Sequence, residues 1–127
     1  MIVDDDPVCR TALEGAFRRQ NVSTGSFEDG AEAWRNIQAG PDVFLAVVNW
    51  MLPGVDGHRI CEWLTQHSPT TTTVLMVGRR FLSEAWAEIR FQGHGILPKP
   101  FWAAQIDQEV GRIMAIASRR ALEGTEI

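Results

Sequence analysis

Short apolar runs and stretches of apolar residues at helical spacing alternate along the whole chain. Residues 43–48 form a continuous apolar run rich in β-branched side chains, which is typical of a strand buried on both faces of a parallel sheet. Shorter runs predict four more strands, and Pro98 is expected to end the last one. The predicted strands cover residues 1–3, 22–27, 43–48, 73–77 and 95–97.

Between these runs, apolar residues recur three and four positions apart, as they do on one face of a helix. Asp6 before Pro7 predicts the start of the first helix, and Asp29 can cap the second. The apolar face is clearest in the fifth predicted helix. After it, residues 119–127 are expected to fray into a tail or linker. The positions that define the five helices are Cys9, Leu13, Ala16 and Phe17; Ala33, Trp34 and Ile37; Ile60, Trp63 and Leu64; Leu82, Ala85, Trp86 and Ile89; and Ile106, Val110, Ile113, Met114 and Ala117.

This strict alternation of strand and helix predicts an α/β fold, with a parallel sheet, helices on both faces and right-handed crossovers. In such sheets, ligands bind outside the carboxyl ends of the strands. Candidate chemistry is therefore expected at three predicted strand ends. They are the acidic run of residues 4–6, Asn49, and Lys99 after Pro98.

Composition and charge exclude several classes of protein. The chain has 127 residues, the size of one ordinary domain, and a formal net charge of −4 without a block of Lys or Arg. Nucleic-acid binding by this domain is therefore not expected. No apolar run has transmembrane length and no signal peptide opens the chain, so we expect a cytoplasmic protein without membrane contact. Cys9 and Cys61 are expected to be free thiols.

Three motifs resemble those of bacterial response-regulator receiver domains, which act in two-component signalling. They are Val3-Asp4-Asp5-Asp6-Pro7 with Arg10 one turn later, the segment from Asn49 to Gly57, and Lys99-Pro100-Phe101. Each follows a predicted strand, in the order that the family has. The resemblance covers residues 1–118, which leaves residues 119–127 as the tail, and it implies the flavodoxin-like (βα)₅ fold with strand order 2-1-3-4-5.

The resemblance also implies roles for single residues. Asp4 and Asp5 match the acidic pocket that helps to hold Mg²⁺, and Lys99 matches the lysine that contacts the phosphoryl group. Asn49 stands where the phosphoaccepting Asp belongs. Without a third carboxylate to compete for it, Lys99 is expected to lean towards Asp5 or Asp4.

Three positions depart from the family pattern, and together they indicate a pseudo-receiver. An aspartyl phosphate forms when a carboxylate oxygen attacks phosphorus, and the amide of Asn49 is a very poor nucleophile. Gly78 has no hydroxyl where the family usually has Ser or Thr, and Ile96 stands where an aromatic switch residue is common. We therefore expect a receiver that is released from phosphorylation control and acts through protein–protein interaction.

The metal site and the partners follow from the same resemblance. Asp5, the Asn49 carbonyl and the Met51 backbone carbonyl are the expected ligands of a weak Mg²⁺ site, because one negative charge is missing. No cofactor is required. The expected partner is a histidine kinase or an effector domain, and a homodimer could form through the fourth helix, fifth strand and fifth helix. Trp102 is a candidate anchor on that face.

The first strand, residues 1–3, is short for a central strand. Either the native start lies upstream, or the domain tolerates a short strand here.

Two other functions stay open at this point. The first is an ordinary phosphorelay receiver whose acceptor was altered from Asp to Asn at position 49. The second is a phosphatase, since the segment from Asp4 to Val8 also fits the opening motif of the haloacid-dehalogenase type, with Asp4 as nucleophile, Asp6 as general acid and Lys99 as that family's lysine. That scheme lacks an acidic pair after a later strand to hold Mg²⁺, so the protein is not expected to be an enzyme.

Overall fold

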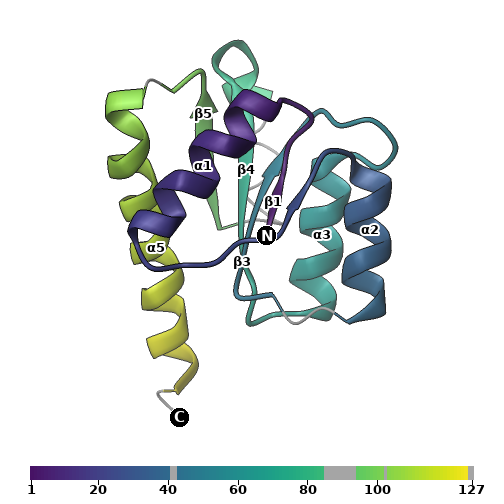
Figure 1. Ribbon diagram of the computed structural model, residues 1–127. Coiled ribbons are helices and arrows are strands. Elements are labelled where there is room, and N and C mark those ends of the chain that lie inside the picture. Colours follow the sequence, from purple (N-terminus) through teal and green to yellow (C-terminus); the bar gives the residue numbers. More distant parts are fainter. Residues whose placement is uncertain (41–42, 85–93, 102, 126–127) are drawn as a thin grey trace.

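A computed structural model describes residues 1–40, 43–84, 94–101 and 103–125 of the chain. In this part of the chain, five parallel strands form one sheet in the order β2-β1-β3-β4-β5, with helices on both faces (Figure 1). The predicted α/β architecture and strand order are confirmed. The elements are β1 (Ile2–Val3), α1 (Pro7–Arg19), β2 (Ser26–Phe27), α2 (Gly30–Ala39), β3 (Leu45–Asn49), α3 (Gly57–His67), β4 (Thr72–Gly78), the 3₁₀ helix η1 (Arg79–Phe81), β5 (Gly95–Lys99) and α5 (Ala103–Thr125).

Two apolar cores lie on the two faces of the sheet, because successive side chains of a strand point to opposite faces. Helices α1 and α5 cover one face and α2 and α3 cover the other (Figure 1). In β3, Val47 packs towards α1 and α5, whereas Ala46 and Val48 pack towards α2 and α3. All residues from Leu45 to Val48 are buried, as predicted for a strand that is covered on both faces.

The two predicted helix caps are present. The Asp6 carboxylate accepts a hydrogen bond from the Val8 backbone N–H at 3.0 Å, and Pro7 occupies the first turn. The Asp29 carboxylate accepts one from the Glu32 N–H at 2.7 Å. Both carboxylates satisfy N–H groups that have no partner within the helix.

The end of the fifth strand was predicted wrongly. Pro98 lies inside β5, where it pairs with Val77, and the strand continues to Lys99. A proline is tolerated here because β5 is at the edge of the described sheet, so the missing N–H breaks no central ladder. This extension places Lys99 directly beside Gly78 at the sheet's carboxyl edge.

Helix α5 continues through the first part of the expected tail, as far as Thr125. The Arg120 guanidinium donates hydrogen bonds to the carbonyl oxygens of Pro69 and Thr71, each at 2.9 Å. These bonds tie the second half of α5 to the loop before β4. Whether the domain ends at residue 118 stays a prediction.

Several predictions fall outside the described residues. Ala85, Trp86 and Ile89 of the fourth predicted helix are among them, and so is Trp102. The dimer face to which that helix would belong therefore stays a prediction.

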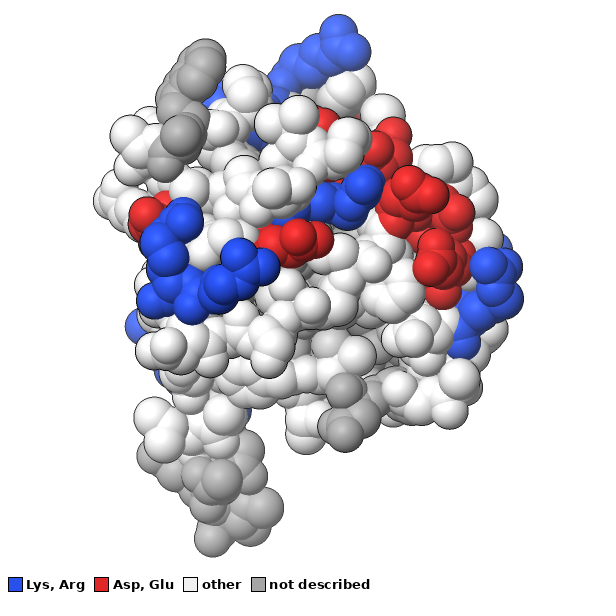
Figure 2. Space-filling model, viewed as in Figure 1, with Lys and Arg blue, Asp and Glu red and all other residues white. Residues whose placement is uncertain are grey.

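No helix in the described ranges is both long and apolar enough to span a membrane. Figure 2 shows one face of the molecule, on which Lys and Arg side chains lie in separate groups among neutral and acidic ones. This face offers no continuous basic surface of the kind that follows a nucleic-acid backbone.

Candidate functional site

The residues predicted to form the site meet at the carboxyl edge of the sheet. Asp4 directly follows β1, Asn49 ends β3, and Gly78 and Lys99 are register partners at the ends of β4 and β5. Asn49, Gly78 and Lys99 line one hollow of about 260 Å³. The parallel sheet thus gathers residues that are up to 95 positions apart in the sequence.

Asp4 and Lys99 form a direct ion pair. The Lys99 Nζ atom donates to Asp4 Oδ2 at 2.9 Å, and the Asp4 side chain is fully buried. Burial by itself lowers the pKa of Lys99, but its hydrogen bond to Asp4 and the negative charge of Asp4 outweigh this effect and raise the pKa above its ordinary value. Of the two acids towards which Lys99 was expected to lean, the structure selects Asp4.

Further donors surround the Asp4 carboxylate and backbone. Its Oδ1 atom accepts from the Asp6 N–H at 3.1 Å, and the Arg10 side chain donates to the Asp4 carbonyl oxygen at 2.6 Å. The Cys9 thiol donates to the Asp4 carboxylate. Burial and this hydrogen bond hold the pKa of Cys9 well above its ordinary range, so the thiol stays protonated. Every oxygen of Asp4 therefore has a partner inside the protein.

The Asn49 amide group spans the place where a metal ion was predicted. Its Nδ2 atom donates to the Met51 carbonyl oxygen at 2.9 Å and lies 3.4 Å from Asp5 Oδ1. Asp5 and Met51 supply two of the three predicted Mg²⁺ ligands, and here an N–H donor approaches both of them. A carboxylate at position 49 could not make these contacts, because an ionised carboxylate only accepts hydrogen bonds.

Two glycines let the loop after β3 fold tightly against the site. Gly54 has a φ of 86°, a conformation that residues with side chains rarely adopt. At Gly57 a Cβ atom would lie 1.9 Å from the Asn49 carbonyl oxygen, so the first turn of α3 can approach the end of β3 only without a side chain.

Ile96 does not belong to this group. It is buried in the core between the sheet and helices α2 and α3, with 4% of its surface exposed. It stands where the family commonly has an aromatic switch residue, and here its aliphatic side chain packs in the core. Gly78 lies at the site but offers only its backbone.

Four residues of the site were missed in the sequence: Trp50, Met76, Arg80 and Phe81. Trp50 and Phe81 face each other edge to face, with ring centroids 6.2 Å apart, and both line the hollow together with Arg80. Trp50 follows Asn49 directly in the sequence, so its place beside the predicted site could have been inferred from this neighbourhood. Arg80 and Phe81 belong to η1, a turn whose position depends on the strand before it and not on a local pattern.

Comparison with known proteins agrees with this geometry. The family model described as the response regulator receiver domain matches residues 1–111. The chain is 30% identical over 113 residues to the DNA-binding transcriptional regulator NtrC of Escherichia coli strain K12. It is 25% identical over 119 residues to the transcriptional regulatory protein TcrA of Mycobacterium tuberculosis strain H37Rv.

These matches cover 88% and 94% of this chain but only 23% and 46% of the two relatives, so the chain spans less than half of either protein. Among solved structures, the signal receiver domain of an HD domain-containing protein from Pseudomonas fluorescens Pf-5 superposes with a TM-score of 0.82 and 20% identity, over 99% of this chain and 90% of that one. A receiver domain protein from Clostridium thermocellum gives a TM-score of 0.79 at 16% identity, with coverages of 95% and 94%. At these identities, the structures establish the fold alone.

Proposed function

This chain belongs to the response regulator receiver domain family, and we propose that it is a receiver that works without phosphorylation. It would act in two-component signalling through protein–protein contacts. The observation that carries this proposal is the amide of Asn49, which stands at the end of β3 in place of a carboxylate. Receiver domains are signalling modules and not enzymes, and the family assignment removes the support for the phosphatase alternative.

The chemistry of phosphoryl acceptance supports the proposal. A carboxylate oxygen must attack phosphorus, and the amide of Asn49 is a very poor nucleophile at neutral pH. Asp4 is no substitute, because it is fully buried and both of its oxygens accept hydrogen bonds. Asp5 is exposed but follows a different strand, and the Asn49 amide approaches its carboxylate.

The donor set fits Mg²⁺ poorly. Receiver domains can bind Mg²⁺ at the phosphorylation site, and this ion prefers carboxylates and other hard oxygen ligands. Here Asp4 is held by Lys99, and the Asn49 N–H group is aimed at the oxygens of Asp5 and Met51. In the described part of the chain, no three His, Cys, Asp or Glu residues are grouped to hold a metal ion. We therefore propose weak Mg²⁺ binding at most, with no role in a reaction.

The positions that would report phosphorylation also favour this proposal. Gly78 cannot donate a side-chain hydrogen bond to a phosphoryl oxygen, and Ile96 is packed in the core. A single altered acceptor would leave these two positions unexplained. All three together fit a domain whose signalling state does not depend on a phosphoryl group.

The partner is proposed from the family. It would be a histidine kinase or an effector domain, and the relatives' names suggest an output in transcription for a longer protein. Self-association through β5 and α5 together with the fourth helix is a further possibility that stays a prediction.

Beryllofluoride, which mimics a phosphoryl group on aspartate, separates the proposal from the altered-acceptor alternative. The amide NMR signals of Gly78 and Lys99 would be followed in the whole chain and in Asn49→Asp, with Mg²⁺ present. We expect no response from the natural chain and little from the variant, because position 78 still lacks a hydroxyl. A saturable response of the natural chain would contradict the proposal. A strong Mg²⁺-dependent response of Asn49→Asp alone would favour the altered-acceptor alternative.

A further inference from the structure

The hollow beside Asn49 has the size and lining of a small-molecule site. Its volume is about 260 Å³, below the range of drug-sized pockets, so it suits a molecule of roughly ten non-hydrogen atoms. Trp50 and Phe81 supply aromatic walls, and Met76 adds an apolar side chain. Gly78 leaves the space open because it has no side chain.

The charges that line the hollow are positive. Lys99 and Arg80 both line it, and no acidic residue in the described part of the chain does. Lys99 uses one of its three N–H donors on Asp4, and no other described residue accepts from it. Arg80 lies over the Phe81 ring, 4.8 Å from its centroid, and forms no ion pair with a described residue.

The charges around the hollow favour a ligand with one negative charge over a ligand with two. Asp4 pairs with Lys99, and Asp5 contacts Asn49 at the rim, so these two acids offset the two cations of the lining. The doubly charged form of phosphate would be repelled more strongly by Asp5 than a monoanion would. A monoanion needs only the guanidinium and the free ammonium N–H groups, and an apolar body gains by leaving water for the aromatic walls.

We propose that this hollow binds a small monocarboxylate with an aromatic or branched aliphatic body. The carboxylate lies between Lys99 and Arg80, and the body lies against the edge-to-face pair of Trp50 and Phe81. Because η1 and the end of β3 both contact it, the ligand fixes their relative position. The inference rests on the proposed function, since a phosphoryl group on residue 49 would compete for Lys99.

The test is an NMR titration of the whole chain with three probes. Benzoate carries both the charge and the apolar body, benzamide is its neutral analogue, and inorganic phosphate is an anion without an apolar body. The Trp50 indole and the Gly78 amide signals report binding at the hollow. We expect saturable benzoate binding with a dissociation constant on the order of 1 mM, as for other ligands of this size. Benzamide should bind about tenfold more weakly, and phosphate should not saturate these signals.

Three variants locate the site. Gly78→Thr fills the hollow and should abolish benzoate binding. The backbone there has φ −58° and ψ 138°, and an added Cβ would lie 3.5 Å from the Phe81 ring, an ordinary contact, so the variant should fold. Arg80→Gln should weaken benzoate about fivefold by removing one charge at the surface. Arg79→Gln, on the neighbouring residue that does not line the hollow, is the matched control and should bind as the natural chain does.

Three results would overturn the inference: no benzoate effect on Trp50 and Gly78, equal binding of benzamide or phosphate, or undiminished benzoate binding by both Gly78→Thr and Arg80→Gln. The proposed function can fail separately. A phosphoryl adduct on the natural chain would contradict that proposal even if benzoate bound as expected. Absence of both an adduct and benzoate binding would overturn only the inference drawn here.

Discussion

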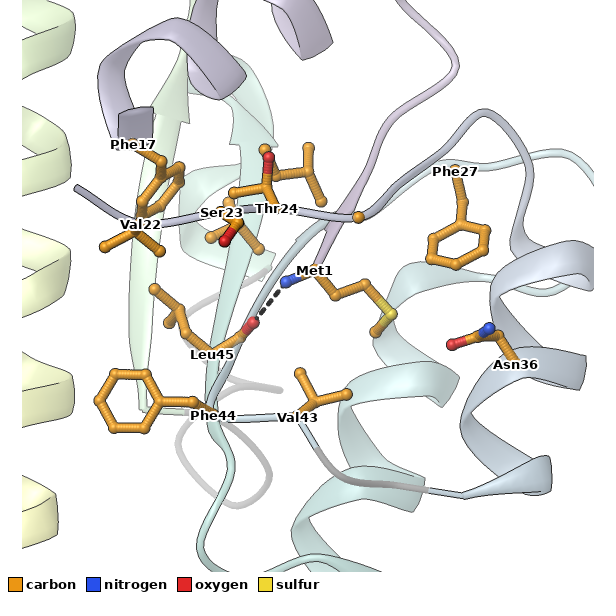
Figure 3. A pocket seen from close by; sticks show the side chains of 13 residues that line it. Met1, Phe17, Val22, Ser23, Thr24, Phe27, Asn36, Val43, Phe44 and Leu45 are labelled. Carbon is orange, nitrogen blue, oxygen red and sulfur yellow. Dashed lines mark hydrogen bonds between the residues drawn. The ribbon is translucent and has the colours of Figure 1, made fainter. Parts of the chain in front are cut away.

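At the carboxyl end of the sheet, the ammonium group of Lys99 lies 2.9 Å from a buried carboxylate, whereas the ammonium group of Met1 at the amino end donates to a neutral carbonyl. That acceptor is the Leu45 oxygen, at 2.8 Å (Figure 3). The hollow around Met1 measures about 370 Å³, and the described residues that line it include no acid. Apolar side chains such as Phe44 and Val43 border it (Figure 3).

Burial lowers the pKa of both ammonium groups, but Lys99 has a carboxylate partner that outweighs this effect and Met1 has a neutral one. Burial lowers the pKa of the Met1 amine from its ordinary 8.0 to about 6, whereas Asp4 keeps the pKa of Lys99 above its ordinary value. The difference shows that an opposite charge within hydrogen-bonding distance decides whether a partly buried ammonium stays protonated. At the carboxyl end, the buried Asp4 carboxylate is thus satisfied by groups of the protein itself.

The largest effect is expected from breaking the ion pair at the carboxyl end. Lys99→Met leaves the Asp4 carboxylate buried without its counter-charge, which should lower the free energy of unfolding by ~3 kcal/mol. Urea unfolding at neutral pH measures this loss. The double variant Asp4→Asn/Lys99→Met removes the unpaired charge and should recover part of it. A loss below ~1 kcal/mol for Lys99→Met would show that the pair is not what stabilises this edge.

Acetylation of the Met1 amine removes the other buried charge. In a chain that begins with a free amine at Met1, the folded-state pKa of this amine is lower than the unfolded one, so the unfolded state binds more protons between pH 6 and 8. The stability is therefore complete above pH 8 and decreases as the pH falls to 6, by ~2 kcal/mol in total. The acetylated chain keeps an N–H donor for Leu45 and should lose this pH dependence. If urea unfolding showed the same change of stability with pH for the acetylated and the unacetylated chain, the Met1 amine would not be its source.

Removal of the Arg120 side chain should have a smaller effect. Arg120→Ala loses hydrogen bonds to Pro69, Thr71 and the Thr72 hydroxyl, and we expect a loss of ~1.5 kcal/mol in the free energy of unfolding. Arg119→Ala, the exposed neighbour, is the matched control and should change little. If a chain cut after residue 118 were as stable as the full chain, the second half of α5 would not be part of the folded unit.

The smallest expected effect concerns His94. Its Nδ1 atom accepts a hydrogen bond from the Thr73 N–H at 3.0 Å, so this nitrogen is unprotonated in the folded state. Burial lowers the pKa of His94 below its ordinary 6.5, and the charge of Arg120 lowers it further. The stability from this group is present above pH 6.5 and is lost as the pH falls below it.

His94→Ala should lower the free energy of unfolding by ~1 kcal/mol at pH 7.5. It should also remove the loss of stability that the natural histidine causes below pH 6.5. Acetylation of Met1 should leave that loss in place, which separates the two groups. An unchanged acidic slope in the His94 variant would show that the histidine is not its source.

The fold and most of the site could be predicted because both depend on local signals. Buried parallel strands read as continuous apolar runs, and the capping acids and strand-end motifs stand at fixed offsets from them. Asp4, Asn49 and Lys99 meet because the carboxyl ends of parallel strands lie at the same edge of the sheet, and the long Lys99 side chain reaches Asp4 there. These predictions depend on residue type and position along the chain, and not on how individual side chains pack.

The remaining features depend on contacts between distant segments. The sequence does not show whether Lys99 reaches Asp4 or Asp5, since this depends on the burial of Asp4. The contact of Arg120 with the loop before β4 depends on how α5 lies across the sheet, and the hollow depends on where η1 places Phe81. Pro98 misled the prediction because its effect depends on whether the strand is central or at an edge.

Intact-mass analysis after incubation of the natural chain with acetyl phosphate and Mg²⁺ tests the absence of a phosphoryl acceptor most directly. A phosphorylatable receiver treated in parallel serves as the positive control. The amide of Asn49 predicts that the natural chain keeps its unmodified mass while the control gains one phosphoryl group. A stoichiometric, base-labile phosphoryl adduct on the natural chain would contradict the account.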